Sequence, residues 1–369
     1  MGNVITYVQE NLKTFDEFAF SAADSLVLST LSYFYLPRNT EYNGQTFRFR
    51  SGEKGLPLKD LYRAEYFPEM FDKSVIKEDG KKVFAAMCAS PRVRDVVVRD
   101  YTDIFDKEIQ AQFAAMTFEL SADMVYVAFR GTDITMNGWK ENINMGRHEP
   151  VTSQLAASVY LTKIAKEFDG KIYTGGHSKG GNLAVYAAAN LTDDLLQKVE
   201  LIFDHDGPGF TDEYLEDPGF QRIVERTRKT VPEFSVIGRI FLQLNEPRVI
   251  KSSYTGMMQH HPMSWIIENN DFVDCNPSSA ALLLSEGFNS AAKNMTEEER
   301  ENFTNSLFRL INEDIEDTDD LTSNLLDTGA DFFRNFRKMD DSSKNIIIET
   351  LKKIAGGSFR SLSEKIFPF

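Results

Sequence analysis

The pattern of apolar and polar positions changes near residue 93. Upstream, residues 14–35 contain no Pro or Gly and space their apolar side chains loosely as a helix does, which predicts an N-terminal helix. Downstream, apolar strand-like runs alternate with helical stretches, in the order 124–129, 151–168, 171–176, 180–191 and 199–206. This alternation indicates an α/β fold with a mainly parallel central sheet covered by helices on both faces.

The composition shifts again after about residue 285. Helix-forming runs at 296–311 and 342–355 are separated by acidic turns, and Thr296 and Glu299 have the spacing of a helix capping box. We therefore expect residues 1–285 to form the α/β domain with its N-terminal helical segment. Residues 286–369 are expected to form a helical C-terminal extension.

Charge and composition exclude several classes of partner. The 369 residues carry a formal net charge of -15 without a basic stripe, so the phosphate backbone of nucleic acid and anionic lipid surfaces are poor partners. The chain has no secretory leader pattern and no apolar stretch of the roughly 20 residues that span a bilayer. We expect a cytoplasmic protein without an integral membrane segment, whose two cysteines, Cys88 and Cys275, are reduced. The oligomeric state is left open.

The sharpest chemical signal is the pentapeptide Gly176-His177-Ser178-Lys179-Gly180, which matches G-x-S-x-G. This motif forms a tight strand-to-helix turn that lifts the serine hydroxyl above the sheet, and side chains at the flanking glycines would clash. A buried strand precedes the motif here and an alanine-rich helix follows it, as the turn requires. An inert glycine-rich turn is the alternative, but the phosphate-binding patterns are absent. The motif predicts an α/β-hydrolase fold with Ser178 as nucleophile.

A serine needs a base, and the base needs an acid to orient it. In the chain order of α/β-hydrolases the histidine comes last, which leaves His260 or His261 as the base. Asp206 ends the strand after the motif, at the carboxyl edge where sites of open α/β sheets lie, and Glu233 is the second candidate acid.

The oxyanion of the intermediate needs N–H donors. Lys179, directly after the nucleophile, and Thr132, after the strand 124–129, are the candidates for these backbone donors.

Several blocks of the chain resemble a known family. FRGTD (129–133), GWKEN (138–142) and GGHSKGGNLAVYAA (175–188) are similar to class 3 lipases and, more narrowly, to the bacterial Mbeg1-like family. The resemblance extends over nearly the whole chain and implies an α/β-hydrolase fold with a Ser178–His260 pair. Members of the family usually have Gln-His-Asp where this chain has Gln259-His260-His261, which favours His260. Class 3 lipases carry an Asp just before a Val-Pro pair, whereas Lys229-Thr230 precede that pair here, so Asp206 is the substitute acid.

These residues together predict a serine hydrolase of the lipase or esterase type. Ser178 would attack the acyl carbon of a small-molecule or lipid-like ester, with His260 as base, Asp206 as acid, and Lys179 and Thr132 as oxyanion donors. This chemistry requires no metal and no organic cofactor. The alternative is a non-catalytic binding or scaffold protein on a hydrolase fold, because a fold does not fix a function.

Overall fold

The computed structural model describes residues 2–37, 40–42, 45–47, 55–72, 74, 76–106, 111–132, 145, 150–282, 285–286 and 289. An eight-stranded sheet is its centre, in the strand order β10-β9-β8-β7-β6-β5-β4-β3. The strands are β3 (Leu56–Pro57), β4 (Val97–Asp106), β5 (Ala111–Ser121), β6 (Met124–Phe129), β7 (Lys171–His177), β8 (Val199–His205), β9 (Thr227–Pro232) and β10 (Arg248–Ile250).

The strands from β6 to β10 pair in parallel, and those from β3 to β6 pair antiparallel. The two-residue turn Ala122-Asp123 joins β5 to β6, which is too short for the crossover that a parallel pair needs. The predicted α/β class with a mainly parallel sheet is confirmed, and the antiparallel edge is an addition that the sequence did not predict.

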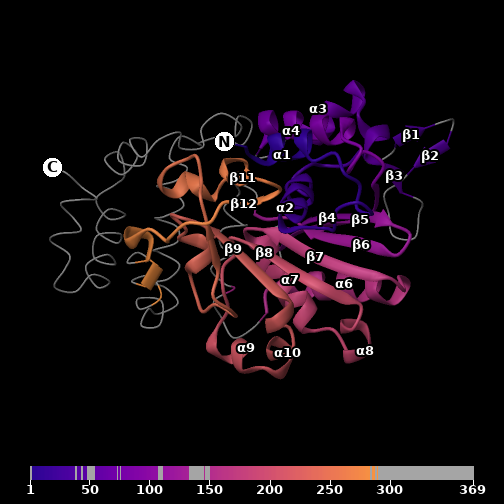
Figure 1. Cartoon of the computed structure of the whole chain (residues 1–369). Helices are drawn as coiled ribbons and strands as arrows, with labels where there is room; N and C mark the ends of the chain where they lie inside the picture. Colours follow the sequence, from indigo (N-terminus) through magenta and orange to yellow (C-terminus); the bar gives the residue numbers. More distant parts are fainter. Residues whose placement is uncertain are drawn as a thin grey trace.

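Helices cover both faces of this sheet (Figure 1). One face carries α1 (Val4–Glu10), α2 (Ala22–Leu31), α3 (Phe67–Phe71) and α4 (Lys77–Ala89). The other face carries α6 (Thr152–Glu167), α7 (Lys179–Ala189), α8 (Asp193–Leu196), α9 (Asp212–Glu216) and α10 (Pro218–Gln221).

Strand β6 shows how the two cores are divided. Val125, Val127 and Phe129 belong to the core on the α6–α7 face, whereas Tyr126 and Ala128 belong to the core that contains α2. Successive side chains of a strand point to opposite faces, so a continuous apolar run is what a strand buried on both faces requires.

Short elements complete the fold. The small strands are β1 (Thr40–Tyr42), β2 (Gln45–Phe47), β11 (Ile267–Glu268) and β12 (Asp271–Phe272). The 3₁₀ helices are Leu58–Leu61, Ala64–Tyr66, Val224–Arg226, Ile237–Arg239, Gly256–His260 and Pro262–Ser264. Within the described ranges, none of the helices has the length and apolar character that a membrane span requires.

The N-terminal helix differs from the prediction for 14–35. Helix α2 begins at Ala22 because Ser21 and Asp24 form a capping box, in which the Asp24 carboxylate accepts from the backbone N–H of Ser21 at 2.9 Å. Asp24 also pairs with Arg92, whose guanidinium donates to backbone carbonyls of the preceding loop, Phe18 among them. The predicted C-terminal extension, 286–369, lies outside the described residues except for positions 286 and 289.

Candidate active site

Ser178 occupies the sharp bend between β7 and α7. Its backbone has φ 58° and ψ -133°, a conformation that costs a non-glycine residue on the order of 1–3 kcal/mol and that persists only where its surroundings hold it. The N–H of Ser178 donates to the carbonyl of His205 on β8 at 2.9 Å, which anchors the bend to the sheet. The bend therefore has the strained geometry that the G-x-S-x-G motif predicts.

The two glycines of the motif are required by close packing. A Cβ atom on Gly176 would lie 2.3 Å from the carbonyl carbon of Gly180. One on Gly180 would lie 2.1 Å from the carbonyl oxygen of Phe129 at the end of β6. Real Cβ atoms do not approach backbone so closely, so only glycine lets the helix start directly over the strands.

His260 and Asp206 are hydrogen-bonded to each other. The imidazole Nδ1 lies 2.6 Å from Oδ2 of Asp206, and because a carboxylate only accepts, Nδ1 carries the proton. Asp206 is fully buried, and its other oxygen accepts from the Ser235 hydroxyl at 2.5 Å. With Nδ1 protonated, the Nε2 atom of neutral His260 is the acceptor, which is the tautomer a general base requires.

His177 connects this pair to the bend. Its ring centroid lies 4.6 Å from that of His260, and its Nε2 donates to the His260 carbonyl oxygen at 2.7 Å. Its Nδ1 accepts from the Tyr33 hydroxyl at 2.9 Å. Burial and the neighbouring His260 lower the pKa of His177 well below its ordinary value, so the ring stays neutral. His177 directly precedes Ser178, and it thus holds the main chain of His260 close to the bend.

The register of the sheet places Ser178 and Asp206, the candidate nucleophile and the candidate acid, at corresponding positions of neighbouring strands. His177 on β7 pairs with His205 on parallel strand β8, and Ser178 and Asp206 each follow directly. Both lie at the carboxyl edge of the sheet, as expected for a site in an open α/β fold. Asp206 also has a positive φ of 56°, so both residues leave their strands in constrained turns.

The other candidates for base and acid have different surroundings. His261 accepts from the backbone N–H of Met263 through Nδ1 at 3.3 Å and so caps the 3₁₀ helix Pro262–Ser264. Glu233 is exposed, whereas Asp206 is the residue bonded to His260.

The loop after β6 lies against the bend. Phe129 pairs with Gly176 in the sheet, and a Cβ on Gly131 would meet the carbonyl oxygen of His177 at 2.6 Å. Thr132, the next residue of this loop, is half-buried, and Lys179 is the first residue of α7. N–H groups in the first turn of a helix point outward from its positive end, which suits a developing anion.

Sequence reasoning missed the residues that support the site. Tyr33 and Ser235 contact the site through side chains, yet they come from segments about 145 and 57 residues away from Ser178 in the chain. Both lie in blocks that resemble the family, DSLVLSTLSYFY (24–35) and VPEFSVIG (231–238), but only the three-dimensional contacts show that these two side chains meet the site. Phe210 and Phe220 are buried in the core on the α6–α7 face.

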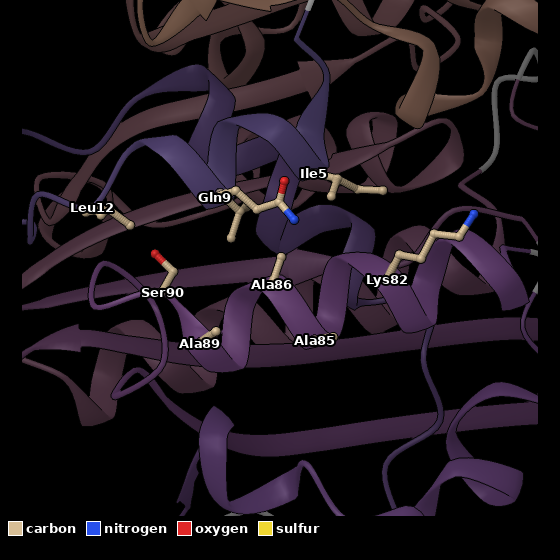
Figure 2. A pocket seen from close by; sticks show the side chains of 9 residues that line it. Ile5, Gln9, Leu12, Lys82, Ala85, Ala86, Ala89 and Ser90 are labelled. Carbon is tan, nitrogen blue, oxygen red and sulfur yellow. The ribbon is translucent and has the colours of Figure 1, made fainter.

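A separate cavity of about 550 Å³ lies between α1 and α4. Figure 2 shows the side chains that line it, among them Ile5, Leu12, Lys82 and Ala86. None of its lining residues belongs to the site around Ser178, so the cavity is not the place of this chemistry.

Comparison with known proteins gives one family match. The sequence model of the Mbeg1-like family matches residues 87–309, more than half of the chain, and this range includes Thr132, Ser178, Lys179, Asp206 and His260. No curated protein matches.

Among solved structures, the chain is similar to M37 lipase, with 13% identity and a TM-score of 0.34 over 60% of this chain and 70% of that one. It is also similar to the lipase of Rhizomucor miehei in its propeptide complex, with 14% identity and a TM-score of 0.32 over 62% and 80% of the two chains.

Proposed function

This chain belongs to the Mbeg1-like family, and we propose that it is a serine hydrolase that cleaves an ester or related acyl bond through an acyl-enzyme on Ser178. The observation that carries the proposal is the 2.6 Å hydrogen bond between His260 and Asp206, beside a serine held at φ 58°. A buried carboxylate that fixes the Nδ1–H tautomer prepares the imidazole to accept a proton at Nε2.

The first half of the reaction forms the acyl-enzyme. Oγ of Ser178 bonds to the acyl carbon while its proton passes to Nε2 of His260, and Asp206 stabilises the resulting imidazolium. The N–H groups of Lys179 and Thr132 donate to the oxyanion. The bond to the leaving group then breaks, and that group departs with the proton from His260.

The second half returns the enzyme to its starting state. Water loses a proton to His260 as its oxygen bonds to the acyl carbon, and the carboxylic acid leaves as Ser178 recovers the proton. Each step uses the same base and the same donors. The substrate class is a small-molecule or lipid-like acyl compound, and the chemistry proceeds without a metal or an organic cofactor.

The test is hydrolysis of p-nitrophenyl esters of graded acyl length by the purified chain. We expect turnover by the wild type and by a Ser121→Ala control, which removes a hydroxyl at the end of β5. Ser178→Ala should abolish turnover without lowering the unfolding temperature. Absence of turnover and of covalent labelling in the folded wild type would instead favour a binding or scaffold protein.

A further inference from the structure

The turn that carries Asp206 passes through a left-handed backbone conformation. Asp206 has φ 56°, in the left-handed region that L-residues other than Asn and Asp rarely enter. Gly207 follows it directly and has no side chain with which to anchor the turn. The N–H of Asp206 donates to the Thr230 carbonyl oxygen at 2.8 Å and its carboxylate accepts from Ser235, so the part of the turn that still needs an anchor is the backbone of Gly207.

A buried ion pair holds both polar groups of Gly207. Nζ of Lys229 lies 2.6 Å from Oδ2 of Asp204, and the two side chains are 3% and 4% exposed. The same ammonium donates to the Gly207 carbonyl oxygen at 2.6 Å. The Gly207 N–H in turn donates to Oδ1 of Asp204 at 2.8 Å. Asp204 and Lys229 are also register partners on β8 and β9, so the sheet itself sets their separation.

The ion pair also touches the helix that follows the nucleophile. A Cβ on Gly181 would lie 2.2 Å from Oδ1 of Asp204, and one on Gly207 would lie 2.7 Å from the carbonyl oxygen of Ser178. The carboxylate of Asp204 is therefore packed between the turn of Asp206 and the first turn of α7. Asn182, also on α7, donates to the carbonyl oxygens of the next two residues of the turn, Pro208 and Gly209, at 3.1 and 3.0 Å.

We propose that Lys229 and Asp204 are positioning residues, which hold the Asp206 turn in register with Ser178 so that the carboxylate meets His260. This inference rests on the proposed function. The pair differs from an ion pair that only stabilises the fold, because each partner also bonds the backbone of the turn. A buried pair whose only role is structural can be replaced by apolar side chains with little loss of stability.

Two variants separate positioning from stability. Lys229→Met removes the donor to Gly207 and leaves Asp204 buried without its cation. Since burial already raises the pKa of Asp204 and Lys229 opposes that shift, the carboxyl should then take up a proton. The double variant Asp204→Leu/Lys229→Met removes both charges. It should regain part of the stability that the single variant loses, because no charge is left buried alone, whereas Gly207 now lacks partners for both its N–H and its carbonyl group.

We expect kcat/KM for an ester to fall about 100-fold in both variants, mainly through kcat. A loss of this size corresponds to a displacement of the catalytic groups by about 1 Å. Lys163→Met is the matched control, because Nζ of Lys163 also donates to a buried carboxylate, that of Asp100, at 2.6 Å. Lys163 lies on α6, a helix that carries no candidate site residue. Its kcat/KM should equal that of the wild type. Recovery of kcat together with stability in the double variant would overturn the proposal.

A second readout does not depend on activity. Ring ¹⁵N resonances of histidine distinguish the Nδ1–H from the Nε2–H tautomer, and those of His260 are assigned by their loss in His260→Ala. At alkaline pH we expect the Nδ1–H form in the wild type and in Lys163→Met, and a tautomer mixture in the double variant. An unchanged Nδ1–H form in the double variant would refute positioning even in an inactive protein. Inactivity of the wild type alone would refute only the proposed hydrolase.

Discussion

Replacement of Asp206 by Asn is the most informative single perturbation. The substitution keeps the size of the side chain but removes its charge and makes one of its two polar atoms an NH₂ donor. If the NH₂ group faces His260, Nδ1 must accept and the ring proton moves to Nε2, where it blocks the uptake of the serine proton. If the oxygen faces His260, the NH₂ group meets Ser235 and the imidazolium loses its counter-charge.

The size of the loss follows from the geometry. Opposite unit charges on atoms 2.6 Å apart attract by about 6 kcal/mol at an effective dielectric constant of about 20. At about 1.4 kcal/mol per tenfold change in rate, this attraction corresponds to roughly four orders of magnitude. His260 is 27% exposed, and solvent recovers part of the loss. We therefore expect kcat to fall by about 10³- to 10⁴-fold, as for the same substitution in serine proteases.

The assay is steady-state hydrolysis of the best ester in the panel, with kcat and KM measured separately at neutral pH. KM should change little, because Asp206 is fully buried and acts on the transition state through His260. Glu233→Gln is the control, since Glu233 is the exposed second candidate for the acid. A loss below about tenfold in Asp206→Asn, or a large loss in Glu233→Gln, would refute the assignment of the acid.

Three further predictions concern the bend, the fold and its response to acid. Gly180→Ala should destabilise the protein by at least about 2 kcal/mol in urea unfolding, because its Cβ would overlap the Phe129 carbonyl; near-wild-type stability would contradict this packing. Arg92→Leu should lower the free energy of unfolding by about 3–5 kcal/mol, since it leaves Asp24 buried without its partner, and a loss below about 1 kcal/mol would contradict it. Burial lowers the pKa of His205 to about 3, so the unfolded chain takes up a proton there first as the pH falls below about 6.5. The free energy of unfolding should therefore decline as the pH falls from about 6.5 toward 3. His205→Gln should reduce the slope of this decline by up to about 1.4 kcal/mol per pH unit, and an unchanged slope would contradict the buried neutral state of His205.

The parts of the site that local chemistry dictates were predictable from the sequence. The bend at Ser178 follows from glycines that permit close packing, and the place of Asp206 follows from the carboxyl end of a strand beside it. The choice of His260 over His261 came from the family resemblance. The structure supplies a physical reason, since His261 caps a 3₁₀ helix and His260 bonds to Asp206.

Features that depend on long-range contacts were not predictable. The start of α2 at Ala22 is set by the Ser21 cap and by the pairing of Asp24 with Arg92, 68 residues away in the chain. An amphipathic pattern shows where a helix is favoured, but not which cap and which buried ion pair set its first residue. Lys229 likewise has no distinguishing feature in the sequence, and only the structure shows that it pairs with Asp204 on β8.

Covalent trapping shows whether Ser178 is a reactive nucleophile. The folded chain would be treated with a fluorophosphonate, digested, and mapped by peptide mass spectrometry, with Ser178→Ala treated in parallel. We expect one phosphonyl adduct on Ser178, formed far more slowly in Asp206→Asn and absent from Ser178→Ala. An adduct on another residue, or an unmodified Ser178 in the folded wild type, would contradict it.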